Sequence, residues 1–525
     1  MDCQGIISEI KKISPRFCAL SCRQSYPDEI RIEVAPHLFK DACLALHKIL
    51  SSPVMALYAL DERKERNKFV VNCIFVDIKD GLWVVVSMDI PEENPSFDSL
   101  ARDIHSASLF EREIWEMFGI EPKGNPDLRR LRLHDEVCPR GNHPLRKDFV
   151  KIEDGKLSDY KFNRVEGEGV FEAPVGPVHA GIIPPGHFRF SVAGEPIINL
   201  EIRLGFIHRG VEKLFEGKTC QEAVRIAQSV SGDSNFAHSL AFIDAAEKIM
   251  GLTPPRQALY LRAVFLELER MYNHVNDIGG MATDVGFGFP AAFASIIKEA
   301  ILQLNEKLTG SRYLKGVNSI GGVSAVIEKN GKALLLDTLE KVTADFRGLD
   351  KMLSSSDSFM DRVDSTGVLR RKTAEDLGVV GLPARASGME MDLRKHFPGV
   401  YHEAGFNMAI RRKGDVLARF KVRSSEFGES ARLIKEFAGK IKPGENSLVE
   451  SEGKAGEALG YAEGWRGPVL YSVKTDASGL IERCKIVDPS FHNWQGLSYA
   501  VLENIIPDFP LCNKSFNLSY PGNDL

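Results

Sequence analysis

The sequence predicts an α+β protein with two unlike parts: a small α+β domain over residues 1–150 and a larger, mainly helical domain over 171–525 with a small β-rich piece at its start. Three observations favour this division. Short β-rich runs alternate with amphipathic stretches in the first part, residues 151–170 are polar enough to form a linker, and apolar residues recur at helical spacing in the second part.

Each predicted element follows from a local pattern. Residues 38–49 are amphipathic at helical period, whereas 69–76 and 82–88 are dense in Val, Ile and Phe and predict two neighbouring strands of an antiparallel or mixed sheet. Two further short β-rich runs, 188–192 and 197–200, flank Ala193-Gly194 and predict an edge hairpin. Three long helices are then expected over 220–250, from Pro254-Pro255 to Gly280, and over 291–308.

Composition excludes several classes of protein. Hydrophobic residues make up 43% of the 525 and charged residues 26%, which predicts a packed core rather than disorder. The net charge of −5 gives no general attraction to nucleic acid, so no nucleic-acid partner is expected. The first residues lack a secretory pattern and no 18-residue apolar run is present, so we expect a cytoplasmic chain, at most peripheral to a membrane.

Nine cysteines are spread along the chain without a Cys-x-x-Cys spacing, and their number is odd. Neither a disulfide framework nor a cysteine-ligated cluster is indicated, so we expect buried thiols in a reducing compartment and no iron–sulfur cluster in this chain. Cys18 and Cys22, the closest pair, have the spacing of one helix face.

The first informative segment runs Glu111-Arg112-Glu113-Ile114-Trp115-Glu116-Met117-Phe118-Gly119, followed by Asn125-Pro126-Asp127-Leu128-Arg129-Arg130 and His143-Pro144-Leu145-Arg146-Lys147-Asp148-Phe149. Its basic residues suit bidentate pairing with acidic groups of a partner, while a solvated basic loop is the plain alternative. The segment resembles the 30 kDa module of respiratory complex I, except that Asn125 replaces the usual His. The resemblance implies partner docking by these side chains: Glu111, Glu113, Arg129, Arg130, Arg146 and Lys147.

The second segment, residues 176–190 and 200–213, resembles the opening of energy-converting (group 4) nickel–iron hydrogenase large subunits and of the homologous 49 kDa module of complex I. In the complex I branch a histidine of this loop faces the quinone headgroup, so the resemblance implies that His179 or His187 inherits that role; the sequence does not choose between them. The segment also carries charges that must pair if buried, among them Glu201, Arg203, His208 and Arg209.

The third segment decides the chemistry that the resemblance implies. Where these hydrogenases read Cys-Gly-Ile-Cys before Phe-Ala-His-Ser, this chain reads Ser231-Gly232-Asp233-Ser234-Asn235-Phe236-Ala237-His238-Ser239. The C-terminal ligand pair of the family, Cys-x-x-Cys, falls on Ser519 and Gly522.

A nickel–iron site needs soft thiolates, which serine and glycine do not supply, and Cys220, Cys484 and Cys512 lack ligand-pair spacing. Hydrogenase activity is therefore rejected and no metal is expected. If the helix is continuous, Ser231, Ser234 and His238 share one face and line a polar pocket, although Gly232 stands where complex I has a quinone-binding tyrosine.

The fourth segment is the predicted helix around Glu267-Leu268-Glu269-Arg270-Met271-Tyr272-Asn273-His274, which resembles a helix shared by both branches. Its spacings allow either a buried ion-pair network or a solvated face. The candidate charge network comprises Glu201, Arg203, His208, Arg209, Arg262, Glu267, Arg270 and His274. Further matches in family order lie at 381–388, 463–467 and 488–494.

The resemblance as a whole implies a component that fuses the 30 kDa and 49 kDa types, in a membrane-bound, complex I-like or hydrogenase-4-like NADH-quinone oxidoreductase assembly peripheral on the inner face of the cell membrane. Expected partners are a small iron–sulfur subunit, a ferredoxin-like subunit and membrane-arm subunits. The chain itself is expected to hold no cofactor; the clusters belong to partners, and a quinone or another small molecule is the candidate electron acceptor. A non-redox coupling or scaffold subunit is the alternative, and a functional hydrogenase large subunit is the less favoured one. Whether the chain itself is enzymatic stays open.

Overall fold

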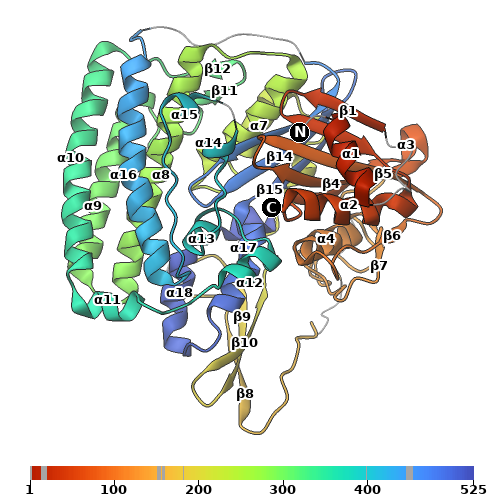
Figure 1. Ribbon diagram of the computed structural model, residues 1–525, viewed down its shortest axis with the longest axis horizontal. Coiled ribbons are helices and arrows are strands. Elements are labelled where there is room, and N and C mark those ends of the chain that lie inside the picture. The colour runs from red at the N-terminus through yellow and green to blue at the C-terminus, as the bar shows by residue number, and fades with distance from the viewer. Residues whose placement is uncertain are drawn as a thin grey trace.

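The computed structural model describes residues 3–13, 21–150, 155, 160–180, 183–397, 399–444 and 453–525. Its fold class is mixed α+β, as predicted: strands gather in the N-terminal part, and long helices stand side by side in the C-terminal part (Figure 1). Residues 151–154 and 156–159 of the predicted linker lie outside the described residues, so that boundary stays a prediction.

The N-terminal part is built on a five-stranded sheet of order β1-β2-β5-β4-β3. The sheet is mixed, because β2 and β5 run parallel while the other neighbours run antiparallel. A second, parallel pair joins β6 to β7. The strands are β1 (Ser21–Tyr26), β2 (Glu29–Glu33), β3 (Ala56–Glu62), β4 (Lys68–Asp77), β5 (Leu82–Pro91), β6 (Ser96–Asp98) and β7 (Glu121–Lys123).

Both faces of this sheet are covered. Helix α2 packs on β4 and β5 from one side, and residues of the C-terminal part, such as Leu459 and Leu470, join the same apolar cluster. The double cover explains why the predicted strands are continuous apolar runs rather than alternating ones. The helices here are α1 (Cys3–Ile13), α2 (Pro36–Leu50), α3 (Arg63–Arg66), η1 (His105–Ala107) and α4 (Ser108–Phe118).

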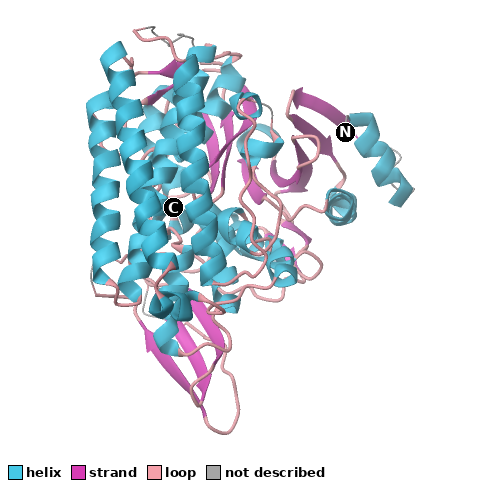
Figure 2. Ribbon diagram, turned by 60° about the vertical axis from the view of Figure 1, so that its left-hand side comes forward, coloured by secondary structure: helices cyan, strands magenta, loops and turns pink. Residues whose placement is uncertain are grey.

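A three-stranded antiparallel sheet projects from the body as a finger (Figure 2). The predicted hairpin is present as β9 (His187–Ala193) paired with β10 (Ile197–Arg203), and β8 (Val170–Val175) adds a third strand beside β9. Apolar side chains are exposed on and beside this finger, among them Phe171, Val178 and Ile198.

Four long helices, α8 (Arg256–Asp284), α9 (Gly288–Thr309), α10 (Lys329–Ser354) and α16 (Val416–Lys440), pack together as a bundle (Figures 1 and 2). Within the described ranges, no helix is both long and apolar enough to cross a bilayer. Five shorter helices of the described residues lie in the chain between α10 and α16: α11 (Asp357–Val363), α12 (Arg371–Leu377), α13 (Gly381–Ala386), α14 (Leu393–His396) and α15 (Val400–Glu403). A small β11–β12 pair (Asn318–Ser319, Gly322–Val323) follows α9.

The helix predicted over 220–250 is wrong in its middle, because α6 (Cys220–Ala227) and α7 (Asn235–Met250) are separate. The intervening Ser231, Asp233 and Ser234 use their side chains to bond one another, which competes with helical backbone bonding. Helix α5 (Val211–Leu214) precedes them.

A C-terminal antiparallel sheet, which the sequence analysis missed, lies between the bundle and the N-terminal part (Figure 1). Its strands are β13 (Gly456–Glu463), β14 (Pro468–Thr475) and β15 (Ile481–Val487), and α7 packs against β13 and β14. The chain closes with α17 (Pro489–Ala500), η2 (Ile506–Asp508), α18 (Phe509–Phe516) and α19 (Tyr520–Asp524).

A buried ionic junction ties this sheet to the N-terminal part. Lys485 on β15 lies 2.5 Å from Glu113 of α4 and 3.2 Å from Glu212 of α5, and Arg132 lies 3.0 Å from Glu113. Arg483 pairs with Glu212 at 2.7 Å. Burial alone would raise the pKa of Glu212, but Arg483 and Lys485 outweigh it and hold the pKa at about 2.

Replacing Lys485 with Met should cost about 3–5 kcal/mol of stability, because it leaves two buried carboxylates short of a cation. Denaturant unfolding of the full chain measures the loss. The control is Lys372→Met, which removes the exposed 2.5 Å pair with Asp376 and should cost at most about 1 kcal/mol. Equal losses in the two variants would contradict the structural role of the junction.

Candidate functional site

A cluster of small polar side chains lies at the start of α7 and meets the C-terminus of the chain. Ser231 Oγ is 2.8 Å from Ser519 Oγ and donates to Asp233 at 2.9 Å, and Ser234 donates to the same carboxylate at 3.2 Å. Arg466 closes the group with two 2.7 Å bonds to Asp233. We call Ser231, Asp233, Ser234, Arg466 and Ser519 the serine cluster.

Electrostatics hold Asp233 ionised. Partial burial would raise the pKa of Asp233, but the Arg466 guanidinium and the two serine hydroxyls outweigh it and hold the pKa at about 2. Trp465 adds a 2.9 Å bond from its indole nitrogen to Ser234 Oγ. One side of the cluster faces outward: Gly232 is exposed, and the Asp233 side chain keeps 40% of its surface accessible.

A second carboxylate stands beside the cluster. Asp488 accepts a bond from the His238 ring at 3.0 Å, and the other ring nitrogen of His238 lies 3.0 Å from the Tyr471 hydroxyl. A Cβ placed on Gly522 would overlap the Asp488 carboxylate, so glycine is the residue that fits there. Ser519 meanwhile caps α19 by accepting a 3.0 Å bond from Gly522 N.

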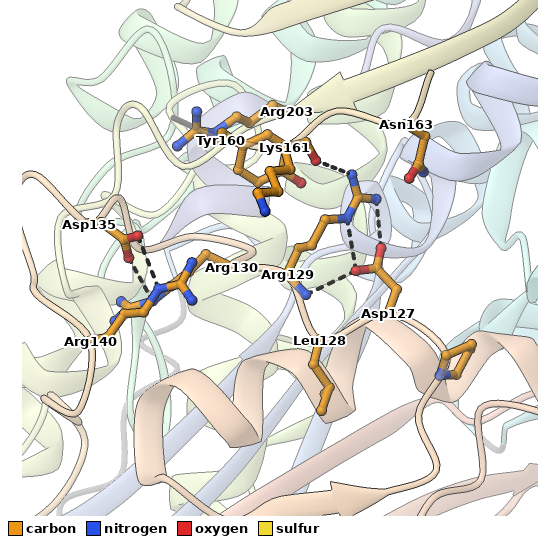
Figure 3. A pocket seen from close by; sticks show the side chains of 11 residues that line it. Asp127, Leu128, Arg129, Arg130, Asp135, Arg140, Tyr160, Lys161, Asn163 and Arg203 are labelled. Carbon is orange, nitrogen blue, oxygen red and sulfur yellow. Dashed lines mark hydrogen bonds and ion pairs between the residues drawn. The ribbon is translucent and has the colours of Figure 1, made fainter. Parts of the chain in front are cut away.

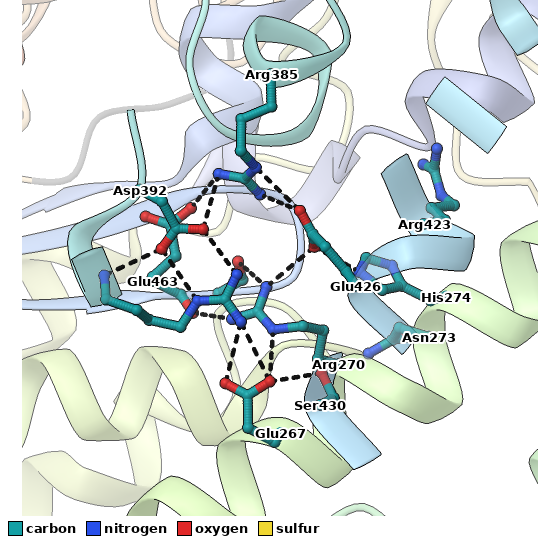
Figure 4. Close-up of polar contacts among 12 residues, drawn as sticks. Glu267, Arg270, Asn273, His274, Arg385, Asp392, Arg423, Glu426, Ser430 and Glu463 are labelled. Atoms are coloured by element: carbon teal, nitrogen blue, oxygen red, sulfur yellow. Dashed lines mark hydrogen bonds and ion pairs between the residues drawn. The ribbon is translucent and has the colours of Figure 1, made fainter. Parts of the chain in front are cut away.

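A larger set of buried charges, the buried charge network, lies between α8, α13 and α16 (Figure 4). Glu267 lies 3.1 Å from Arg270 and 3.2 Å from Arg394. Glu426 binds His274 at 2.8 Å and Arg385 at 2.9 Å. The network consists of Glu267, Arg270, His274, Arg385, Asp392, Arg394, Glu426 and Glu463, all buried.

Four acids face three arginines in this network, so one carboxyl is in excess when His274 is neutral. Glu463, 2.8 Å from Arg385, is the group that responds: burial and the nearby Asp392 raise its pKa to about 7. Burial also lowers the pKa of His274, whose Nδ1 has no hydrogen-bond partner. The network is therefore close to neutral when Glu463 carries a proton.

Short connections join the two sets of residues. Arg270 donates to the Gly464 carbonyl at 3.0 Å, and the turn from Glu463 to Arg466 carries a member of each set. Asn273 donates to the Asp233 carbonyl at 2.7 Å. Glu269 of α8 reaches the start of α7, where its carboxylate accepts bonds from Phe236 N at 2.8 Å and Ala237 N at 3.0 Å.

Comparisons with known proteins match both the N-terminal and the C-terminal part of the chain. Residues 32–154 match the respiratory-chain NADH dehydrogenase 30 Kd subunit family, and residues 284–453 match the 49 Kd subunit family. Hydrogenase-4 component G of Escherichia coli K12 is 30% identical, covering 99% of this chain and 92% of its own length. The chain belongs to this family of fused complex I 30 kDa and 49 kDa modules.

Other members and a solved structure extend the comparison. Formate hydrogenlyase subunit 5 of Escherichia coli K12 is 29% identical over 95% of this chain and 89% of its own. A chain of the archaeal membrane-bound sulfane sulfur reductase has the same fold, with a TM-score of 0.64 over 68% of this chain and 99% of that chain, at 24% identity.

The two candidate histidines of this family's first loop bond to the loop itself. His179 Nε2 lies 2.7 Å from the Gly186 carbonyl, and His187 Nδ1 lies 3.2 Å from the Gly176 carbonyl. His187 keeps a buried Nε2 without a partner, and burial lowers its pKa. The ring of Tyr520, next to Ser519, packs where a Cβ on Gly186 would lie, so this loop borders the serine cluster. Their role in binding a ligand stays a prediction.

The predicted charge network divides into separate groups. Glu267, Arg270 and His274 do lie together, whereas Arg262 pairs with Glu247 at 2.6 Å. Glu201 binds Arg129 at 2.5 Å, and Arg203 contacts the His134 ring at 3.2 Å. The remaining two predicted members meet the C-terminus: His208 lies 2.7 Å from the Asp524 carbonyl, and Arg209 N donates to the Leu525 carbonyl at 2.7 Å.

The predicted docking residues make contacts within the chain, so their contact with a partner stays a prediction. Glu111 accepts bonds from Ser99, Leu100 N and Asn125, the residue that replaces the family His. Arg130 lies 3.3 Å from Asp135. Arg146 donates to the Phe118 carbonyl at 2.6 Å and Lys147 lies 3.2 Å from Glu216.

Sequence reasoning missed the partners that complete the site. Asp233, Arg466 and Asp488 lie in segments that the family resemblance singled out, and for Arg466 and Asp488 a charge next to apolar residues was the signal that could have found them. The described residues include no cluster of three His, Cys, Asp or Glu side chains suited to a metal ion.

Glu269→Gln should flatten the dependence of stability on pH. Burial raises the pKa of Glu269 to about 8, so the folded chain holds a proton that the unfolded chain releases above its ordinary pKa near 4.5. The stability linked to this proton is complete below the unfolded pKa and is lost as pH rises towards 8, by at most about 5 kcal/mol. The variant lacks that loss.

Unfolding free energies of the wild-type and variant chains across this pH range provide the measurement. The exposed Glu340→Gln on α10 is the matched control and should run parallel to wild type. A Glu269→Gln curve that also runs parallel would show that Glu269 is ionised throughout.

Proposed function

We propose that this chain is the large peripheral-arm subunit of a membrane-bound, complex I-like or hydrogenase-type oxidoreductase, and that it works without a nickel–iron centre. Its relatives are named as a hydrogenase-4 component, a formate hydrogenlyase subunit and NADH-quinone oxidoreductase proteins of the fused C/D type, which supports the assembly type. The proposal that no nickel–iron centre is present rests on one observation, the types of side chain in and beside the serine cluster.

That set does not fit a nickel–iron group. Ser231, Ser234 and Ser519 offer hard hydroxyls where soft thiolates are required, and they already bond to one another and to Asp233. Gly522 offers no ligand, and Asp488 fills the space that a longer side chain would need. The ligand positions of the resembling hydrogenases are here part of a hydrogen-bonded ionic cluster.

The proposed role is to receive electrons from a partner's iron–sulfur cluster for a quinone or another small acceptor, and to couple that transfer to ion movement in the membrane arm. The acceptor would approach the open side of the serine cluster at Gly232 and Asp233. Support comes from the accessible Asp233 side chain and from the direct link between this cluster and the buried charge network through the 463–466 turn.

A second candidate function is a non-redox coupling or scaffold subunit of the same assembly. The favouring observation is that the predicted pocket is occupied by its own side chains: His238 uses both ring nitrogens on Tyr471 and Asp488, and Ser231 bonds Ser519. Such mutual pairing stabilises the fold without leaving donors for a ligand.

Both candidates require partner subunits. The finger formed by β8–β10 exposes Phe171 and Ile198, and the loop after β8 exposes Val178, a type of apolar surface that commonly marks a protein contact. We propose that this finger is covered by a membrane-arm subunit, that the arm also contains a small iron–sulfur subunit and a ferredoxin-like subunit, and that the chain is peripheral on the cytoplasmic face of the cell membrane.

Metal analysis of the assembly, purified with its native partners, tests the metal-free proposal. We expect no nickel and an amount of iron that the partners' clusters explain. Installing cysteines as S231C/S234C/S519C/G522C should not restore nickel binding, because Asp488 occupies the space of residue 522. One nickel bound per wild-type chain would overturn the proposal.

Gly232→Phe separates the two candidate functions. A Cβ on Gly232 meets no atom within 4 Å, so the ring should extend over the open side of the serine cluster without unfolding the chain. If an acceptor binds there, quinone reduction by the assembly should fall at least about tenfold. Gly439→Phe, at another exposed glycine with open space, is the control. Unchanged electron transfer with Gly232→Phe would favour the scaffold role.

A further inference from the structure

A cationic cavity of about 570 Å³ lies where the loop after β7 meets the segment before β8 and the end of β10 (Figure 3). A second cavity of about 240 Å³ adjoins it and shares Asp127, Arg129, Arg130, Tyr160 and Arg203. The first cavity is lined by five cationic side chains, Arg129, Arg130, Arg140, Lys161 and Arg203, and by two acidic ones, Asp127 and Asp135. We call it the arginine pocket.

Some of these cations are already neutralised. Arg129 binds Asp127 at 2.7 Å and Glu201 at 2.5 Å, so its charge is satisfied by two carboxylates. Arg130 and Arg140 share Asp135, at 3.3 Å and 3.2 Å. Even with Glu201 included, five cations of this lining face three acids, an excess of two positive charges that Glu136, near Arg203, reduces to one.

Two guanidinium groups have donors left for a ligand. Arg130 is only 8% exposed, yet its Nη1 has no hydrogen-bond partner, an arrangement that costs free energy unless an acceptor binds. Arg203 contacts the neutral ring of His134 at 3.2 Å and stacks 4.1 Å from the Tyr160 ring centroid, and it forms no ion pair with a carboxylate of the described residues. Burial lowers the pKa of Arg203 by more than the nearby Tyr160, Glu136 and Asp135 raise it.

We propose that the arginine pocket binds a phosphate group, held by Arg130 Nη1 and the Arg203 guanidinium. A phosphate anion matches this excess of positive charge, and its oxygens suit the planar donors of arginine. The adjoining cavity, lined by Leu109, Leu131, Leu200 and Trp494 among others, accepts an apolar organic part of the same molecule. The combined space has the size of a small-molecule site.

The bound phosphate would join three segments that come from both parts of the chain: the 126–140 loop, residues 160–163 and β10. Two sources share this chemistry, a soluble phosphate monoester and the headgroup of an anionic phospholipid. This inference does not depend on the redox or scaffold role proposed above.

The test is calorimetric titration of the full chain with inorganic phosphate at about pH 8, where the dianion predominates, against chloride at matched ionic strength. We expect saturable binding that weakens at least about tenfold in Arg203→Gln. The exposed Arg347→Gln on α10 is the control and should bind as wild type does. Lys161→Gln removes an exposed cation from the rim and should weaken binding about threefold, without risk to the fold.

Parallel measurements with glycerol 3-phosphate and with vesicles of phosphatidylglycerol or phosphatidylcholine identify the source. Tighter binding to either the ester or the anionic vesicle, lost in Arg203→Gln, supports the proposal and names its ligand. Phosphate binding no stronger than chloride binding, or binding that Arg203→Gln and Lys161→Gln leave unchanged, would overturn it.

Discussion

Charge burial is the constraint on which the C-terminal part depends. Seven ionisable carboxyl and guanidinium groups of the buried charge network are almost inaccessible to water, so each requires a partner of opposite charge or, as for Glu463, a proton. The partners come from different elements: Glu267 and Arg270 from α8, Arg385 from α13, Glu426 from α16 and Glu463 from the end of β13. Pairing them fixes how the bundle, the connecting helices and the C-terminal sheet stand relative to one another.

The same constraint reaches the serine cluster through one turn. Glu463 faces the network, while Arg466, three residues later, holds Asp233 with two 2.7 Å bonds. Gly464 and Gly467 exchange backbone bonds at 2.9 and 3.1 Å, which makes the turn compact. A change in the protonation of Glu463 therefore acts on a short, well-bonded segment whose other end sets the geometry of the cluster. This is a physical route by which a charge change in the helices can be felt at the cluster.

The sequence predicted the features that depend on interactions between residues close together in the chain. The helical period of the Glu267–His274 segment and the spacing of Glu267 and Arg270 identified α8 and one ion pair within it. The predicted helix through Ser231 failed because side-chain bonds to Asp233 compete with the helical backbone. The β13–β15 sheet was missed although its strands, like β4 and β5, are almost wholly buried. Long-range partners were beyond sequence reasoning for a different reason: Arg385 and Glu426 lie far from Glu267 in the chain, and only folding brings their charges together.

Electrostatics explain why two carboxylates stand beside Ser231, Ser234 and Ser519. Arg466 is buried and cationic, and His238 needs an acceptor, so an environment of neutral Ser231, Ser234 and Ser519 alone would leave both without an anion. Asp233 provides it for Arg466 and Asp488 for His238. The family resemblance located Ser519 and Gly522 beside the Ser231 segment, but it did not reveal Asp488, because a carboxylate facing a glycine leaves no spacing pattern. The anionic charge that thiolates would supply is thus present as two carboxylates, one of which occupies the volume above Gly522. Cysteine thiolates at these positions would crowd negative charge against Asp233 and Asp488.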